Sequence, residues 1–263
     1  MNKNGLFGVV FLATLLVSVF VFLLLIFSIF KYIDWYHFLK ILFSKEILFA
    51  LKLSLLTSSV ASISAMLFAL PVSYALSRFS FPGKDIIDTI FDVPIILSPI
   101  AIGAILIIFL NNTSIGAFIE NKLLRFTFEI PGIILAQFIV VSALAIRLLK
   151  STFDSVDVRY EKVIRTLGAT RFQTLLHVTI PMAKHGIFAA FVITWARAMG
   201  EFGATVTLAG ATTMKTETLP VAIFLSFARA DVQQAMIVIL ILLLLSVMVL
   251  LVVRRVTKEL VAW

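Results

Sequence analysis

Two side chains of opposite charge, those of Arg197 and Glu201, lie within an otherwise apolar run from Gly186 to Leu208. Because they are four residues apart, they lie on the same face of a helix and can form an ion pair. Charges at membrane depth are costly, and they usually face the interior of a helix bundle or a water-filled cavity. The pair therefore has two interpretations: it holds helices together, or it borders a path for a polar solute.

Small and hydroxyl-bearing residues surround this pair. Gly200 and Gly203 permit a kink or the close approach of another helix, and Thr205 and Thr207 add hydroxyl groups. Hydroxyl groups on one side of a span are suited to a polar route through the membrane. This favours the second interpretation without excluding the first.

A second interruption lies in the apolar run from about Ile90 to Leu110, which contains Pro94 and Pro99. Proline removes a backbone donor and kinks or breaks a helix. In a membrane, the freed carbonyl groups are tolerated only against protein or a water-filled cavity. The sequence therefore predicts a bent or broken helix here. It also predicts a translocation path formed by Pro94, Pro99, Arg197, Glu201, Gly203 and Thr205.

The sequence offers no chemistry typical of an enzyme. It has no cysteine, and its three histidines are not spaced as metal ligands. The one Gly-Lys pair is Gly83-Lys84, and Arg78 stands five residues before Gly83 where a phosphate-binding loop needs glycine. We therefore expect no catalytic residue, no metal and no cofactor.

Composition indicates a membrane protein. The chain of 263 residues is 61% hydrophobic and its mean hydropathy is +1.12, far above the values of soluble domains. The net charge of +8 would also suit a nucleic-acid-binding protein. The basic residues, however, are distributed by membrane side, so we expect contact with the lipid bilayer and none with nucleic acid.

Six apolar runs are long enough to cross a bilayer as helices. They cover residues 5–30, 47–76, 90–110, 130–149, 186–208 and 232–253. We predict an all-α integral membrane protein in which a first span and an interfacial helix (residues 1–46) precede a five-span core (residues 47–263). The interfacial helix is expected at residues 35–43. In the second span, small residues at every fourth position favour close helix packing, namely Thr57, Ala61, Ala65, Ala69 and Ser73.

The distribution of Lys and Arg predicts the orientation. If both termini are cytoplasmic, most of the basic residues outside the spans also lie on the cytoplasmic side. Cytoplasmic loops of membrane proteins carry such an excess. We therefore expect the segment between the fourth and fifth spans to be cytoplasmic.

That segment, residues 155–181, is the one long polar interruption in the second half of the chain. Apolar residues recur there at helical spacing, with Arg159, Lys162 and Arg165 between them, which indicates an amphipathic helix. Gly168 follows at a position where a helix end needs a residue free to adopt positive φ. The pattern predicts a helix that ends in a bend.

A second short helix is predicted after the bend. Thr170 and Gln173 have the spacing of a capping box, in which each side chain accepts a hydrogen bond from a free backbone N–H group. Pro181 is expected to bar a simple helical continuation, because it has no N–H to donate. The product is a bent pair of helices outside the bilayer, which offers a rigid surface to a partner protein.

This segment resembles a pattern in permease subunits of binding-protein-dependent ABC importers: Glu-Ala-Ala, three residues, Gly, nine residues, then Ile-x-Leu-Pro. Here Gly168 is followed by nine residues and then by Val178-Thr179-Ile180-Pro181. Lys162-Val163-Ile164 stand in place of Glu-Ala-Ala, and Glu161 lies one position early. The resemblance implies a cytoplasmic coupling helix that docks on an ATPase subunit through Arg159, Glu161, Lys162, Arg165, Gly168 and Ala169.

A narrower resemblance is carried by residues 197–205, RAMGEFGAT, which are similar to the fifth span of the oxyanion permeases of molybdate, tungstate and sulfate. The segments FPGK (residues 81–84), DVP (92–94) with SP (98–99), and VDV (156–158) also resemble that group. The resemblance implies a permease for molybdate or tungstate, with sulfate or thiosulfate as the alternative. It also implies a homodimer, two ATPase copies and an extracytoplasmic binding protein, in the cell membrane of a prokaryote.

An ion-coupled carrier is the alternative from another class of transporter. Such carriers usually have several intramembrane carboxylates and inverted repeats. Glu201 is the only carboxylate clearly inside an apolar run, and it stands beside Arg197. We therefore expect transport to be driven by ATP bound to another subunit.

Overall fold

The computed structural model describes residues 3–261, and the side chains of residues 7–255. All regular secondary structure in this part of the chain is helical, which confirms the all-α prediction. The long helices are α1 (Lys3–Lys31), α3 (Lys45–Arg78), α7 (Ile130–Asp154), α10 (Ile180–Met199) and α13 (Val232–Val261). The shorter ones are α2 (Phe38–Leu42), α4 (Lys84–Ile96), α5 (Pro99–Asn112), α6 (Ser114–Phe118), α8 (Val158–Thr166), α9 (Arg171–Thr174), α11 (Gly203–Ala209) and α12 (Leu219–Ala228), with π-helical turns η1 (Ile119–Leu123) and η2 (Leu175–Thr179).

Five helical segments of the described chain are long and apolar enough to cross a membrane. They are α1, α3, α7, α13 and the continuous stretch Arg171–Met199, which joins α9, η2 and α10. The pair α4–α5 makes a sixth if it is counted as one broken span. The predicted multi-span architecture is therefore present.

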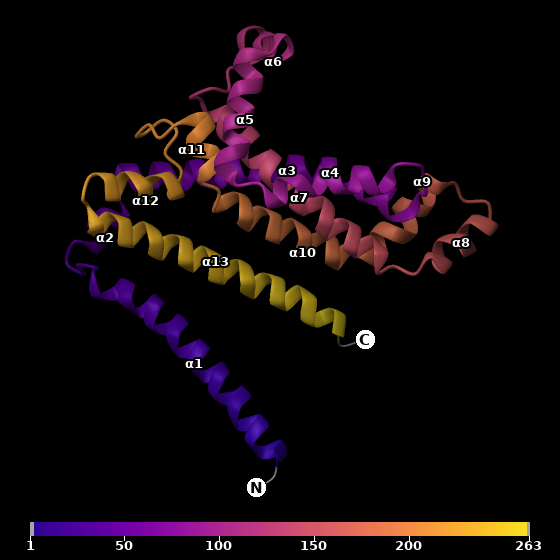
Figure 1. Ribbon diagram of the computed structural model, residues 1–263, viewed down its shortest axis with the longest axis horizontal. Coiled ribbons are helices and arrows are strands. Elements are labelled where there is room, and N and C mark those ends of the chain that lie inside the picture. The colour runs from indigo at the N-terminus through magenta and orange to yellow at the C-terminus, as the bar shows by residue number, and fades with distance from the viewer. Residues whose placement is uncertain (1–2, 262–263) are drawn as a thin grey trace.

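Helices α3, α7 and α10 pack together at the centre of the bundle (Figure 1). The small residues that recur along α3 are completely buried, which confirms their predicted role as a close-packing face. Opposite them, α7 contributes Val141, Ala145 and Leu149 to one apolar cluster. This compact centre provides the rigid frame that holds the other elements.

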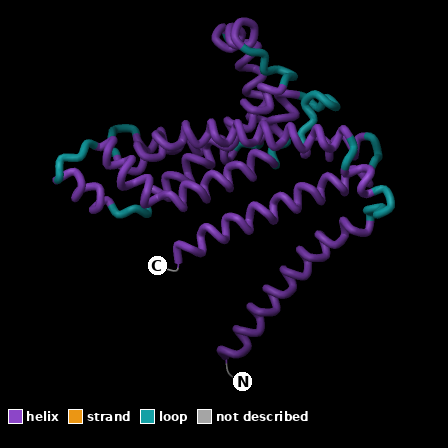
Figure 2. Tube along the Cα trace, turned by 180° about the vertical axis from the view of Figure 1, so that it is seen from behind, coloured by secondary structure: helices purple, strands orange, loops and turns teal. Residues whose placement is uncertain are grey.

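Helix α1 stands apart from the bundle in both views (Figures 1 and 2). Its described side chains are exposed on all sides of the helix and almost all are apolar. A helix that is apolar all round is typical of a segment surrounded by lipid or by another chain. The short helix predicted at residues 35–43 is present as α2.

The third apolar run is broken at Leu97-Ser98, where the chain bends by 109° between α4 and α5. The prediction of a broken helix is confirmed, but α5 projects from the bundle with α6 rather than continuing along α4 (Figure 1). Ser98 adopts an extended backbone, as residues before proline usually do, and its hydroxyl accepts a hydrogen bond from Ala101 N–H. Pro99 then starts α5 at no cost in hydrogen bonds.

Pro181 prevents a simple continuation of the α-helix, as predicted, but it does not end the helix. The chain is helical without a break from Arg171 to Met199. The turn before the proline widens to the π-helix η2, and Ile180 N–H bonds the carbonyl of Leu175 five residues back. This wider turn accommodates a residue that has no N–H of its own.

The connection between the fifth and sixth apolar runs, residues 209–231, contains a helix that was not predicted from the sequence. Helix α12 packs against α13 and α3, and Leu219, Val221 and Ala222 are buried. Its apolar sequence after a Thr-Leu-Pro start was the available signal. It is too short to span a membrane, so length alone hid it.

Candidate functional site

The fifth apolar run, predicted as one span in which Gly200 and Gly203 permit a kink, is broken at residues 200–202, between α10 and α11. Glu201 lies in this break with its side chain 1% exposed. Its Oε1 accepts a hydrogen bond from the backbone N–H of Ala204 (3.0 Å), and its Oε2 accepts one from Nη1 of Arg197 (2.7 Å). The carboxylate therefore satisfies a free donor at the start of α11 as well as its arginine. The predicted ion pair is present, at a helix break.

The two broken helices meet at their breaks. A Cβ added to Gly203, the first residue of α11, would lie 2.9 Å from Cβ of Pro99, the first residue of α5. A Cβ added to Gly103 would lie 2.7 Å from Cβ of Thr207. Glycine at these two positions is what allows α5 and α11 to touch.

A cavity of about 240 Å³ lies at this junction, lined by Pro94, Ile95, Leu97, Pro99, Val140, Leu144 and Arg197. Arg197 is the charged residue of an otherwise apolar wall, and its side chain is 39% exposed. Among the described residues, its guanidinium makes one hydrogen bond, the bond from Nη1 to Glu201. The remaining N–H groups are free to bind another acceptor, and a guanidinium matches the geometry of an oxyanion.

Three of the six predicted path residues, Pro94, Pro99 and Arg197, line the cavity. Glu201 and Gly203 lie directly behind it, in contact with Arg197 and Pro99. Thr205 is fully buried in α11, and no described residue hydrogen-bonds its hydroxyl. The structure thus places five of the predicted residues around one junction and the sixth within its packing.

Sequence reasoning missed Gln137, a buried residue of α7 beside this junction. Its Nε2 donates to the carbonyl of Ala198 (3.1 Å), and its Oε1 has no partner among the described residues. Polar side chains in spans often hydrogen-bond across helices, and a lone glutamine in an apolar run was the signal. It fixes the end of α10 against α7.

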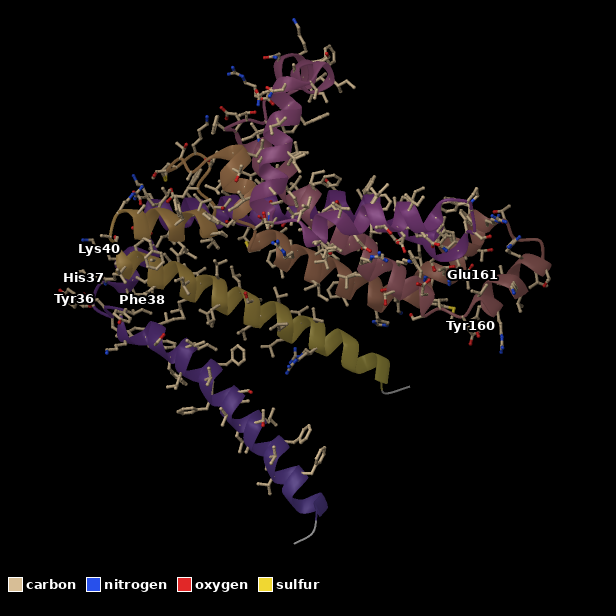
Figure 3. All side chains as sticks on the ribbon, in the orientation of Figure 1. Tyr36, His37, Phe38, Lys40, Tyr160 and Glu161 are labelled. Atoms are coloured by element: carbon tan, nitrogen blue, oxygen red, sulfur yellow. The ribbon has the colours of Figure 1, made fainter. Side chains whose placement is uncertain are left out.

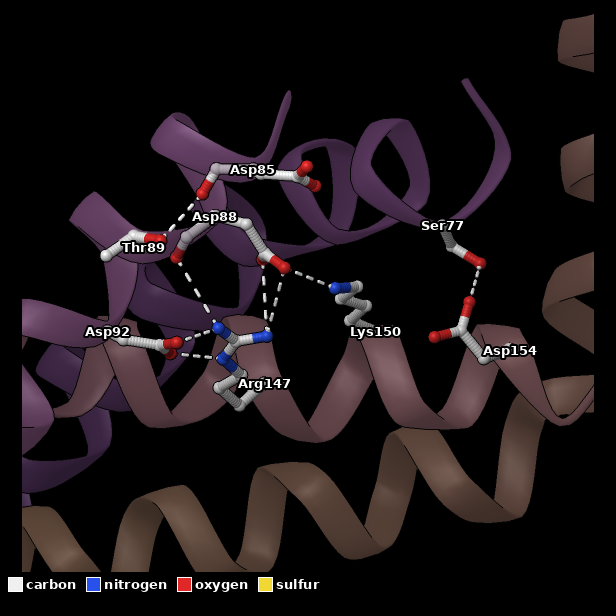
Figure 4. Close-up of polar contacts among 8 residues, drawn as sticks. All are labelled: Ser77, Asp85, Asp88, Thr89, Asp92, Arg147, Lys150 and Asp154. Carbon is white, nitrogen blue, oxygen red and sulfur yellow. Dashed lines mark hydrogen bonds and ion pairs between the residues drawn. The ribbon is translucent and has the colours of Figure 1, made fainter. Parts of the chain in front are cut away.

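A cluster of four charged residues joins α4 to α7 (Figure 4). Asp92 pairs with Arg147 through two hydrogen bonds, and Asp88 contacts both Arg147 (3.2 Å) and Lys150 (2.6 Å). The spacing of Asp88 and Asp92 on one helix, and of Arg147 and Lys150 on the other, is visible in the sequence. From the sequence, however, these cations were used only to predict orientation. The cluster holds the half of the broken span that precedes the cavity.

The polar segment between α7 and α10 forms the predicted pair of helices. Asp157 caps α8 by accepting a hydrogen bond from Arg159 N–H (2.8 Å). Gly168 has φ +93°, the left-handed conformation predicted for the bend. The capping box of Thr170 and Gln173 is present at the start of α9.

Glu161 points into the protein rather than toward solvent. Its Oε1 accepts hydrogen bonds from Nε of Arg78 (2.8 Å) and from the hydroxyl of Thr179 (2.9 Å). The side chains of Arg78 and Glu161 are only 8% and 9% exposed. The carboxylate that we expected to meet an ATPase is therefore bound within this chain. Its partner Arg78 is 83 residues away, and no local pattern connects the two.

The outward face of α8 carries other residues of the predicted docking set. Arg159, Lys162 and Arg165 are exposed, Gly168 is exposed, and Ala169 is half-buried. Large apolar side chains are exposed among them: Tyr160, Val163 and Leu167. Figure 3 places Tyr160 and Glu161 at the end of the bundle opposite α2. Apolar side chains exposed together on a polar helix indicate a protein-binding surface.

A family model described as the binding-protein-dependent transport system inner membrane component matches residues 65–260. The chain belongs to this family. The match includes both broken helices, the cavity between them and the helix pair α8–α9, so the geometry above is that of a transport permease.

Relatives of this permease are named for the transport of molybdenum or of sulfate. The probable molybdenum ABC transporter permease protein of Haloferax volcanii is 37% identical over 174 residues, 66% of this chain and 62% of the relative. The molybdenum transport system permease protein ModB of Escherichia coli K12 is 32% identical over 180 residues, 66% of this chain and 77% of the relative. The sulfate transport system permease protein CysW of Synechococcus elongatus is 33% identical over 184 residues, 70% and 64% of the two chains. The aligned segment thus spans less than two thirds of the Haloferax and Synechococcus relatives.

Solved structures share the fold of this permease. A bacterial alginate ABC transporter in complex with an alginate-bound periplasmic protein matches with a TM-score of 0.77 at 16% identity, covering 98% of this chain and 97% of that one. The MetNI methionine ABC transporter matches with a TM-score of 0.58 at 16% identity, covering 81% and 99%. At such identities the similarity establishes the fold alone.

Proposed function

We propose that this permease carries molybdate or tungstate into the cytoplasm as the membrane subunit of an ATP-driven importer. The proposal rests first on the cavity between the two helix breaks, where Arg197 has free N–H groups in an apolar wall. A tetrahedral dianion presents several acceptor oxygens to such a guanidinium. The relatives named for molybdenum support the same class of substrate.

The Glu201 carboxylate sets how strongly the anion is held. It lies 2.7 Å from Nη1 of Arg197 and neutralises part of its charge. A path must attract an ion and also release it, so a fully unpaired arginine in an apolar wall would bind too tightly. The pair provides a weak, transient contact for a passing oxyanion.

The driving force comes from a separate ATPase, present in two copies. Each copy docks on the outward face of α8, where exposed apolar side chains lie among Arg159, Lys162 and Arg165. Two permease chains form the complete path, and an extracytoplasmic binding protein delivers the anion. ATP draws the two ATPases together, and the movement of α8 opens the permease to the outside. Residues 1–46 precede the core (residues 47–263) as a separate span that lies against lipid or the second permease.

The orientation has both termini in the cytoplasm of a prokaryotic cell, with α8–α9 on the same side. Thr170, just before α9, and Thr212, in the connection between α11 and α12, are both exposed. The sequence has no native cysteine. Thr212→Cys should react with an impermeant thiol reagent added to intact cells, and Thr170→Cys should not. Reversed labelling would refute the orientation and the docking site together.

The deciding experiment reconstitutes the permease with its ATPase in liposomes and adds the binding protein loaded with molybdate, tungstate or sulfate. We expect ATP hydrolysis and uptake to rise with molybdate or tungstate and to rise less with sulfate. A larger response to sulfate would favour the alternative suggested by the relatives named for sulfate. Uptake that follows an ion gradient and not ATP would identify an ion-coupled carrier.

A further inference from the structure

One buried arginine, Arg78, lies where α3, α7 and α8 come together. Its Nε donates to Glu161 on α8 (2.8 Å) and its Nη1 donates to the hydroxyl of the adjacent Ser77 (3.0 Å). Its Nη2 donates to the carbonyls of Phe153 and Val156, both at 2.8 Å. Every nitrogen of the Arg78 guanidinium therefore donates a hydrogen bond. The Arg197 guanidinium, in contrast, donates only one within the described chain.

The acceptors belong to different parts of the chain. Phe153 lies in the last turn of α7, Val156 lies in the connection that follows, and Glu161 lies on α8. Glu161 also accepts the hydroxyl of Thr179, in the π-helical turn that leads into α10 (2.9 Å). The end of α3 is thus joined to α7, to α8 and, through Glu161, to the start of α10.

Burial makes these contacts directional and hard to replace. Both side chains of the pair are less than one tenth exposed, so water does not screen them. The planar guanidinium offers donors in fixed directions, whereas a lysine ammonium is a compact charge on a flexible stem. An arginine is therefore the side chain that can satisfy a carboxylate and two carbonyls at the same time.

Other cations lie nearby and do not replace it. Lys162, Arg165 and Arg171 line the same cavity of about 210 Å³ as Arg78 and Glu161. None of the three pairs with Glu161 among the described residues, and Arg171 lies over the ring of Phe79 instead. The carbonyls at the end of α7 hold the Arg78 guanidinium in position, so that Arg78 and not a neighbouring cation pairs with Glu161.

We infer that Arg78 is a positioning residue for coupling: it holds the docking helix α8 at a fixed angle to α3, α7 and α10. Movement that an ATPase imposes on α8 then passes to all three spans through one buried side chain. The inference rests on the proposed function, because it presumes an ATPase on the outward face of α8. It adds that coupling depends on a residue that does not touch the ATPase.

The test uses the complete complex with Arg78→Lys, which retains the charge but not the fork of donors. Arg125→Lys, the same change at an exposed arginine between η1 and α7, is the matched control. Two quantities are measured: hydrogen exchange of the α8 amides without nucleotide, and ATP hydrolysed per molybdate transported. For Arg78→Lys we expect α8 exchange to be about tenfold faster, as for the loss of one hydrogen bond to a charged group. We also expect severalfold more ATP consumed per molybdate, with the ATPase still bound.

Thr179→Val extends the test to a milder change, because it removes only the hydroxyl bond to Glu161. It should raise both α8 hydrogen exchange and ATP consumption per molybdate, by a smaller factor than Arg78→Lys. If the Arg78→Lys complex does not assemble, Thr179→Val serves as the test in its place. ATP consumption per molybdate equal to that of wild type in the assembled variant would overturn the inference. A wild-type complex that does not couple ATP to uptake would refute the proposed function instead, and α8 exchange would then test the positioning of α8 alone.

Discussion

Two arginine–glutamate pairs of the permease, Arg197–Glu201 and Arg78–Glu161, differ in how they are built. Arg197 and Glu201 are four residues apart at one helix break, and the arginine is partly exposed to a cavity. Arg78 and Glu161 are 83 residues apart, and both are buried where several helices end. The first arginine makes one hydrogen bond in the described chain, and the second uses all its nitrogens.

This difference separates a contact that can serve a substrate from one that can transmit force. A guanidinium with free donors beside a cavity can bind and release an anion without disturbing the fold. A guanidinium with every donor engaged cannot accept a further ligand, and it ties together the elements that it contacts. Removal of the fully engaged arginine should therefore lower the free energy of unfolding more than removal of the arginine beside the cavity.

The largest effect is expected for Arg78→Ala. It leaves the Glu161 charge buried without a cation and removes donors from two carbonyls. Breaking a buried pair in this way costs about 3–5 kcal/mol. Arg197→Ala should cost less, no more than about 2.5–3.5 kcal/mol, because Glu201 still accepts from Ala204 N–H. Thermal unfolding of the two purified variants in detergent compares them, and an equal or reversed order would remove the distinction.

Gly168→Val tests the docking side separately from Arg78. The position has φ +93°, and a Cβ there would meet no atom within 4 Å, so the cost is backbone strain alone. That strain is about 1–2 kcal/mol for an L-residue. We expect the variant to insert in the membrane but to lose oxyanion uptake and stimulated ATP hydrolysis, because the bend between α8 and α9 shifts. Gly168→Asn, which tolerates this conformation better, should retain more activity; normal activity of the valine variant would contradict the docking role.

The two pairs also show what the sequence could predict. Arg197 and Glu201 were found because helical spacing is a local property, and the prolines of α4 and α5 located the second break. Gly168, Thr170 and Gln173 were placed correctly for the same reason: caps act over a few residues. The Arg78–Glu161 pair and the α4–α7 charge cluster depend on which helices become neighbours, and that is decided by packing along the whole chain. The π-helical turn at Pro181 was missed because the turn can widen to accommodate proline.

Replacing Arg197 and Glu201 together by Leu and Met tests whether the pair serves the substrate. Buried ion pairs are often replaceable by apolar residues at little cost, so we expect assembly to recover. A modest loss of stability should remain, because Ala204 N–H loses its acceptor. If the pair borders the anion path, oxyanion-stimulated ATP hydrolysis should stay low in this assembled variant. Full recovery of transport would show that the pair only holds helices together. The matched replacement of Arg78 and Glu161 should instead uncouple ATP hydrolysis from uptake.

The smallest effect concerns another buried carboxylate, Glu217, in the connection between α11 and α12. Its side chain is 1% exposed and accepts a hydrogen bond from Met214 N–H (2.9 Å), but no ion pair joins it to any residue that the structure describes. Burial has the largest effect and raises its pKa. The Met214 N–H lowers the pKa by less, and the smaller effects of the Glu46 and Arg229 charges raise and lower it respectively. Glu161 and Glu201 are each paired with an arginine, and Glu217 is not. Because its pKa is raised, Glu217 keeps its proton to a higher pH than an ordinary glutamate.

The sign of the pH dependence follows from this raised pKa. A carboxyl whose pKa is higher in the folded than in the unfolded protein adds stability below its unfolded pKa, and that stability is lost as pH rises through the folded pKa. Glu217→Gln, which is neutral at every pH, should remove this decline and unfold at a higher temperature than wild type above the raised pKa. Glu129→Gln, at a more exposed glutamate paired with Lys215, should leave the decline in place. Thermal unfolding at a series of pH values from acidic to neutral measures it. Parallel curves for wild type and Glu217→Gln would mean that the buried carboxyl is as well compensated as the two that have an arginine.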